Sequence, residues 1–134
     1  MNTQYWMAVL AYVLPTFPLG YFWHLKTFKA KYDALGIYRD DVIIPLGLSS
    51  MIIQGLFFAW AYPKLFNTAP DQWLTSAIKF AAIFGIVAWS FLVLPVAAKN
   101  KMNSVVDFMK LETAFTAIQF IIAGLLIAYI YRGA

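Results

Sequence analysis

Uncharged residues fill four long runs of the chain, and nearly all charged residues lie in the short segments between them. An α-helix rises about 1.5 Å per residue, so a run of about 20 apolar residues crosses the roughly 30 Å hydrocarbon core of a membrane. Each run is long enough for one crossing. The pattern therefore predicts an all-α fold, a four-transmembrane-helix bundle. The runs comprise residues 1–25, 42–63, 80–98 and 113–131.

The charged segments set the expected limits of the spans. Helical spacing of apolar residues continues past the first span as far as Gly36, a residue type that commonly ends helices. The first helix is thus expected to extend beyond the membrane. We expect one integral membrane domain over residues 1–134, with spans at about 4–24, 42–63, 74–98 and 112–131.

Composition supports a membrane location and excludes some chemistry. Of the 134 residues, 63% are hydrophobic and 12% are charged, whereas soluble domains are about 45–50% apolar. The mean hydropathy is +0.72. No cysteine is present, which excludes disulfides and thiol catalysis. The first run lacks the basic start and cleavage site of a signal peptide, so we expect it to be retained as a span.

Basic residues are concentrated in the first and third connections between the predicted spans. These connections hold seven basic residues, and the opposite side holds two. An excess of Lys and Arg marks cytoplasmic connections. We therefore expect connections one and three in the cytoplasm, both termini outside, and no binding of nucleic acid. The seven are Lys26, Lys29, Lys31, Arg39, Lys99, Lys101 and Lys110; the two are Lys64 and Arg132.

Two prolines interrupt the first predicted span. Pro15 and Pro18 remove backbone donors and free carbonyl groups one turn earlier, which need new partners in lipid. Thr16, a neighbouring helix or a water-filled cavity could supply these partners, and a cavity would make the kink part of a ligand or ion pathway. The simpler interpretation is a packing kink without cargo, because prolines are frequent in membrane helices.

Polar side chains occur deep within the other predicted spans. Either they line one cavity, or they hydrogen-bond across helices, which is worth about 0.6–2 kcal/mol per bond in membranes. The second interpretation is simpler. Small residues also repeat at four-residue spacing, as close helix packing in lipid favours. The polar residues are Gln54, Ser90 and Gln119, with Ser49, Ser50 and Thr116 nearer the inner half; the small ones are Ala77/Ala81/Gly85, Gly55/Ala59 and Gly124/Ala128.

Two further residues in the third span are unusual for their depth. Trp89 lies in mid-span, where its indole N–H needs a partner. Lys79 is the only charge well inside a span, and we expect its long side chain to reach the outer head groups. The alternative is that Lys79 binds an anion or a partner carboxylate in an outward-facing vestibule.

His24, the only histidine, lies at the inner boundary of the first span. One histidine does not make a zinc or iron site. The acidic residues in or beside the cytoplasmic connections could converge with it, but helix capping and pairing with lysines are their simpler roles. We therefore expect no catalytic residues, no metal site and no cofactor. The acidic residues are Asp33, Asp40, Asp41, Asp107 and Glu112.

A short motif at the end of the first span carries a resemblance. Gly20 is followed by Trp23 and His24, and residues 115–131 form the closing span. In these features the chain resembles small four-helix bacterial inner-membrane proteins of uncharacterised function, with His24 where tyrosine is expected. The resemblance implies an inner-membrane location and four spans. It brings no catalytic residues to transfer.

Two classes of function fit these features. The first is a non-catalytic accessory or structural subunit in the lipid bilayer, packed against a membrane-protein partner or against itself as a homo-oligomer. The alternative is a carrier of a small solute, an ion or a lipophilic ligand, built on the Pro15/Pro18 kink and the intramembrane polar residues. The first is favoured because four helices enclose little volume and the span interiors lack acidic residues for ion coupling.

Overall fold

The computed structural model describes residues 1–134, and its regular structure is entirely helical. The all-helical expectation is therefore confirmed. Four helical segments are long and apolar enough to cross a membrane, and each covers most or all of one uncharged run. These segments are Thr3–Thr27, Ile44–Leu65, Trp73–Lys99 and Val105–Tyr131.

Two of the four segments are composed of more than one element. The helix α1 (Thr3–Phe22) continues into a π-helical turn, η1 (Trp23–Thr27), and a short helix, α2 (Lys29–Leu35), follows. The helices α4 (Trp73–Leu92) and α5 (Leu94–Lys99) are separated at Val93. This break was not expected from the run of apolar residues, and it arises where Pro95 lacks the N–H that a continuous helix requires.

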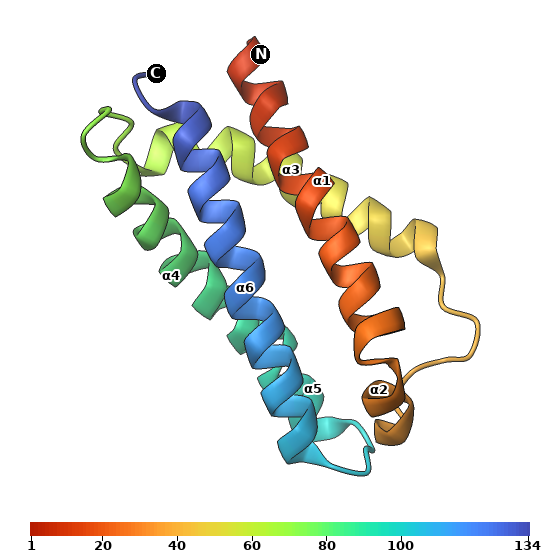
Figure 1. Cartoon of the computed structure of the whole chain (residues 1–134). Coiled ribbons are helices and arrows are strands. Elements are labelled where there is room, and N and C mark those ends of the chain that lie inside the picture. The colour runs from red at the N-terminus through yellow and green to blue at the C-terminus, as the bar shows by residue number, and fades with distance from the viewer.

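The helices α3 (Ile44–Leu65) and α6 (Val105–Tyr131) are uninterrupted, and they differ in their packing. α6 is central, in contact with both α4 and α1, whereas α3 packs mainly on α1. α3 also crosses the other long helices obliquely, and its first turns diverge from α6 (Figure 1).

Both chain ends and the second connection lie at one end of the molecule, and α2, α5 and the third connection lie at the other (Figure 1). Hydrogen bonds join the segments at each end. Thr68 donates to the backbone oxygen of Ala134 at 2.8 Å, and the Asn103 N–H donates to the Leu35 carbonyl at 3.0 Å.

The main hydrophobic core lies in the half of the molecule that holds the termini. Tyr12, Tyr62, Phe80 and Ile127 are fully buried there, one or more from each long helix. The ring of Phe58 contacts Tyr12 and Phe80, each at a centroid distance of 5.2 Å. A smaller core around Tyr32 and Leu35 lies at the α2 end.

α6 approaches the backbone of α4 closely at Gly124. A Cβ atom at this position would lie 2.6 Å from the Ala77 carbonyl oxygen, so only glycine fits without a shift. At Gly55 on α3, a Cβ would lie 3.1 Å from a methyl group of Val13 on α1. Two of the small residues noted in the sequence thus lie at helix contacts, as their spacing suggests.

Candidate functional site

The Pro15/Pro18 segment does not use Thr16 in the expected way. α1 continues through both prolines, and Thr16 is completely buried. Its hydroxyl donates to the Tyr12 carbonyl at 2.5 Å. The carbonyls that the two prolines free are those of residues 11 and 14, one turn before each proline. Thr16 therefore supplies neither of them with a partner.

Gln54 and Gln119 bond to the same side chain, the buried Tyr12. The Tyr12 hydroxyl donates to Gln54 Oε1 at 2.5 Å and accepts from Gln119 Nε2 at 2.8 Å. Gln54 also donates to Ser50 Oγ at 2.8 Å. This network links α1, α3 and α6. Of the two interpretations of these residues, the observed bonds correspond to pairing across helices.

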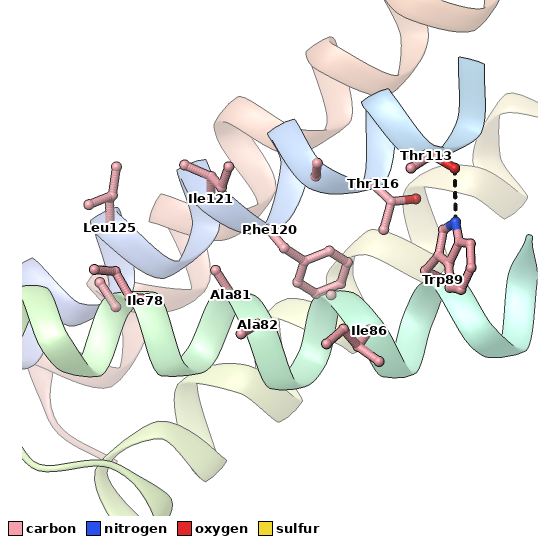
Figure 2. A pocket seen from close by; sticks show the side chains of 13 residues that line it. Ile78, Ala81, Ala82, Ile86, Trp89, Thr113, Thr116, Phe120, Ile121 and Leu125 are labelled. Carbon is pink, nitrogen blue, oxygen red and sulfur yellow. Dashed lines mark hydrogen bonds between the residues drawn. The ribbon is translucent and has the colours of Figure 1, made fainter. Parts of the chain in front are cut away.

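The other candidates lie on α4, apart from the Tyr12 network. Ser90 is exposed and donates to the carbonyl of Val87 in its own helix at 2.9 Å. Lys79 is exposed and takes part in none of the three ion pairs of the chain. Trp89 donates from Nε1 to Thr113 Oγ1 of α6 at 2.9 Å (Figure 2). The predicted site residues are thus not gathered in one place.

The Trp89–Thr113 bond lies at one end of an apolar groove of about 610 Å³ between α4 and α6. Figure 2 shows the ring of Phe120 between the two helices, with Ile86 of α4 on one side and Ile121 and Leu125 of α6 along the other. Ala81, Ala82 and Gly85 are small residues on its α4 side. The groove offers shape and apolar contact, with few polar groups.

A polar cluster around His24 joins the end of α1 to α2 and α6. His24 Nδ1 lies 2.8 Å from the Gly20 carbonyl oxygen, and Nε2 lies 3.0 Å from Glu112 Oε1. The Tyr32 hydroxyl donates to the same Oε1 at 2.5 Å and accepts from Trp23 Nε1 at 3.1 Å. We refer to His24, Glu112, Tyr32 and Trp23 as the His24 cluster.

The π-helical turn η1 positions the two ring donors of the cluster. In this wider turn the Phe28 N–H donates to the Trp23 carbonyl, five residues earlier, at 3.1 Å. Both the Trp23 and His24 rings contact Phe115 of α6, at centroid distances of 5.9 and 4.6 Å. Single π-helical turns recur at functional sites. The Gly20, Trp23 and His24 motif noted in the sequence is therefore part of this cluster.

Hydrogen-bond roles fix the number of protons in the His24–Glu112 contact. The Gly20 carbonyl can only accept, so His24 Nδ1 carries a proton. Nε2 and the Glu112 carboxyl group must then share one further proton, either as imidazolium and carboxylate or as imidazole and carboxylic acid. Without it, two acceptors would face each other at 3.0 Å. The contact is a link between α1 and α6 that requires one proton.

Burial and the Glu112 carboxylate both act on the phenols next to the cluster. Burial raises the pKa of Tyr32 above its usual value, and the hydrogen bond and negative charge of Glu112 raise it further. Tyr38 stacks on Tyr32 at a centroid distance of 5.1 Å, and burial and then Glu112 raise its pKa as well. Both phenols are therefore neutral hydrogen-bonding groups at physiological pH.

We expect the folded protein to lose stability as Tyr32 ionises at high pH. Because its folded-state pKa lies above the unfolded value of 10.0, the contribution of the neutral phenol is complete below pH 10.0 and is lost as pH rises through the folded-state pKa. Tyrosinate absorbance measures this: Tyr32→Phe should remove a late-ionising group. Tyr129→Phe, at an exposed site, controls for loss of a phenol. Ionisation of Tyr32 near pH 10 would contradict the expectation.

A pocket of about 550 Å³ lies beside the His24 cluster. Phe17 of α1 lies on one side, and Gly47 and Met51 of α3 lie on the other. The connection between α2 and α3 completes the lining with Tyr38 and Arg39. His24 itself lies at the boundary, so the pocket and the cluster share a wall. The lining residues come from the region where α3 diverges from α1 (Figure 1).

Only one of the five acidic residues considered in the sequence reaches His24. Asp33 pairs with Lys29 at 2.5 Å and Asp41 with Arg39 at 2.8 Å, the simpler role expected of them. Glu112 does not have that role: α6 begins at Val105, so Glu112 lies about two turns inside the helix and faces the end of α1. No group of three His, Asp or Glu side chains is arranged to hold a metal ion.

Comparisons with known proteins give no family for this chain. No protein-family model, no curated protein and no solved structure matches it. The geometry of the molecule is therefore the basis on which its function is proposed.

Proposed function

We propose that this protein is an integral membrane protein that binds a lipophilic ligand in the pocket beside the His24 cluster and catalyses no reaction. The observation that carries the proposal is the junction of an apolar pocket of about 550 Å³ with the paired His24 and Glu112 side chains. Ligand pockets are typically about 300–1,000 Å³, mostly apolar, with a few polar groups that orient the ligand.

The cost of the ionisable pair supports a functional role. His24 and Glu112 expose only 18% and 16% of their side chains, and they lie in helices apolar enough to span a membrane. Ionisable groups in such helices are costly and usually mark ligand or ion sites. Helix packing alone does not require an ionisable pair, because the neutral hydrogen bond between Tyr12 and Gln119 already joins α1 to α6.

We propose that the pocket opens at the cytoplasmic side of a bacterial inner membrane, with both termini outside. The support is the charge distribution: the pocket lies beside the first connection, and the first and third connections hold seven of the ten basic residues. A solute or ion pathway through the centre of the bundle is less favoured. The polar side chains of Tyr12, Gln54 and Gln119 are hydrogen-bonded to one another there and are not free to bind a solute.

A second candidate function is association with another membrane helix, as expected of an accessory subunit or homo-oligomer. The groove between α4 and α6 favours it, because Ala81, Ala82 and Gly85 let another helix approach closely (Figure 2). The simplest occupant is α4 of a second copy, since each copy presents the same face to a two-fold symmetric contact.

The Gly47→Leu variant tests the ligand-binding proposal. Gly47 lines the pocket, and a Cβ at this position meets no atom within 4 Å, so a leucine side chain begins in open space. We expect native mass spectrometry in mild detergent to show a monomer with one small lipophilic molecule for the unsubstituted protein. We expect Gly47→Leu to lose that molecule.

The matched control is Ser49→Leu, which adds the same side chain on α3 at an exposed position outside the pocket. This variant should keep the ligand. If Gly47→Leu kept it as well, the pocket would not be its binding site. A ligand-free dimer would instead support the second candidate function.

A further inference from the structure

The polar groups of the pocket beside the His24 cluster are suited to a ligand that accepts hydrogen bonds. Arg39 is the only charged residue that lines the pocket, and no acidic residue does. Tyr21 and Tyr38 also line it, and no hydrogen bond within the chain uses the hydroxyl of either residue. Both nitrogens of His24 are already engaged with Gly20 and Glu112. Donors are therefore in excess over acceptors.

Arg39 is held in place and still has unused donors. Its Nε donates to Asp41 Oδ1 at 2.8 Å and its Nη2 to Asp41 Oδ2 at 3.2 Å. A guanidinium has five N–H donors, so Nη1 and part of Nη2 remain free. The pair is exposed, with 59% and 79% of the two side chains accessible, and exposed pairs contribute little to stability. A ligand anion can bind the free edge of Arg39 at little cost.

The start of α3 adds positive potential at the same place. Ile43 and Ile44 line the pocket at the N-terminus of this 22-residue helix, and no side chain caps it. The helix dipole favours negative charge there, while Pro45 has no N–H and the Leu46 N–H already donates to the Ile43 carbonyl at 3.1 Å. This feature supports the role of Arg39, which is the principal anion-binding group.

Beyond this donor-rich region the lining is apolar. Phe17 of α1 faces Ile44 and Met51 of α3, and Gly47 leaves open space between them. An unbranched hydrocarbon chain fits a space between two helices that are themselves apolar. The pocket thus has two chemically different parts, one for a head group and one for a tail.

We infer that the ligand is an anionic amphiphile, whose carboxylate or phosphate head group binds Arg39 and Tyr38 and whose acyl chain lies between α1 and α3. This inference rests on the proposed ligand-binding function and specifies the class of ligand. The head-group chemistry has two sources, a free fatty acid or an anionic phospholipid. The experiment separates them.

The test compares two pairs of ligands, and the members of each pair differ in the net charge of the head group. Oleate and its uncharged methyl ester are titrated into the purified protein in detergent, and binding is measured by native mass spectrometry. Phosphatidylglycerol and phosphatidylcholine are compared in the same way. We expect the anionic member of at least one pair to bind about tenfold more tightly, as one charge-assisted hydrogen bond provides. The pair that shows the preference identifies the source.

Variants locate the preference at Arg39. Arg39→Gln should abolish the tenfold preference and leave binding of the uncharged member unchanged, and Tyr38→Phe should weaken binding of the anionic member by about threefold. Arg132→Gln, at an exposed arginine at the opposite end of the molecule, should leave the preference intact.

The outcomes separate this inference from the function on which it rests. Equal binding of charged and uncharged members, lost in Gly47→Leu, would overturn the anionic class and keep the ligand-binding function. A preference that survives Arg39→Gln would overturn the assigned head-group site. No binding of any of the four probes, with no ligand in the native spectrum, would overturn the function and the inference together.

Discussion

Glu112→Ala should be among the most destabilising substitutions in the chain, lowering the free energy of unfolding by about 3 kcal/mol. The carboxylate is the only acceptor for the Tyr32 hydroxyl, which is fully buried, and it is the partner of His24 Nε2. Alanine leaves the Tyr32 O–H without an acceptor and His24 Nε2 without a partner. Each buried polar group left unpaired costs about 1–3 kcal/mol. Titration with a denaturing detergent, followed by circular dichroism, measures the loss.

The matched control is Glu112→Gln, which keeps the shape of the side chain. Its amide oxygen, at the position of Glu112 Oε1, can accept from both the Tyr32 hydroxyl and a protonated His24 Nε2. We expect a loss of about 1 kcal/mol, because both bonds persist without the charge. If Glu112→Ala were as stable as Glu112→Gln, the His24 cluster would not be the link between α1 and α6.

The four long helices could be predicted because they depend only on local sequence. Each uncharged run is long enough for a membrane crossing. A helix also forms its backbone hydrogen bonds within itself, so it needs no partner from the rest of the chain. The one break within these segments that was not predicted, between α4 and α5, also has a local cause. Pro95 is visible in the third run, and its missing N–H explains the break at Val93 that hydropathy alone does not indicate.

The His24 cluster depends on long-range geometry, so the sequence could not assemble it. His24 and Glu112 are 88 positions apart, and their contact needs both the π-helical turn η1 and the crossing of α1 over α6. Two signals were nevertheless present. One was the motif of Gly20, Trp23 and His24, and the other was an acidic residue at the edge of a long apolar run.

The role of Tyr12 was not predicted, because tyrosines in membrane proteins are generally expected at the interfaces. Tyrosine is enriched at membrane interfaces, which draws attention to the tyrosines near the ends of spans. Tyr12 lies in the middle of α1, where its hydroxyl needs partners for the same reason as the indole of Trp89. Gln54 and Gln119 were recognised as polar residues inside spans, and the tyrosine that joins them was not.

The pocket beside His24 was beyond prediction for a different reason. Its volume comes from the angle at which α3 crosses α1, and that angle is set by contacts such as Gly55 against Val13. Side chains on two helices that are not parallel leave space where the axes diverge. Periodicity assigns faces to a helix and gives no crossing angle.

Gly124→Ala should lower the free energy of unfolding by about 2 kcal/mol, although alanine is the better helix former by about 1 kcal/mol. The added Cβ would lie 2.6 Å from the Ala77 carbonyl oxygen and 3.3 Å from Phe80 Cδ1. The first of these atoms is backbone, so α4 and α6 must separate to make room. In lipid, helix association depends on such close packing because apolar side chains gain little from leaving the bilayer.

Gly85→Ala on α4 is the matched control, since it also adds one methyl group between α4 and α6. Its Cβ would lie 3.4 Å from Phe120 Cβ, an ordinary contact, so the gain in helix propensity should leave stability unchanged or slightly raised. Detergent-induced unfolding measures the free energy of unfolding of both variants. If the helices meet as described, Gly124→Ala lowers it and Gly85→Ala does not. If Gly124→Ala were stabilising, α6 would not contact the backbone of α4 at Ala77. The two helices would then pack in a different register along the groove that ends at Trp89 and Thr113.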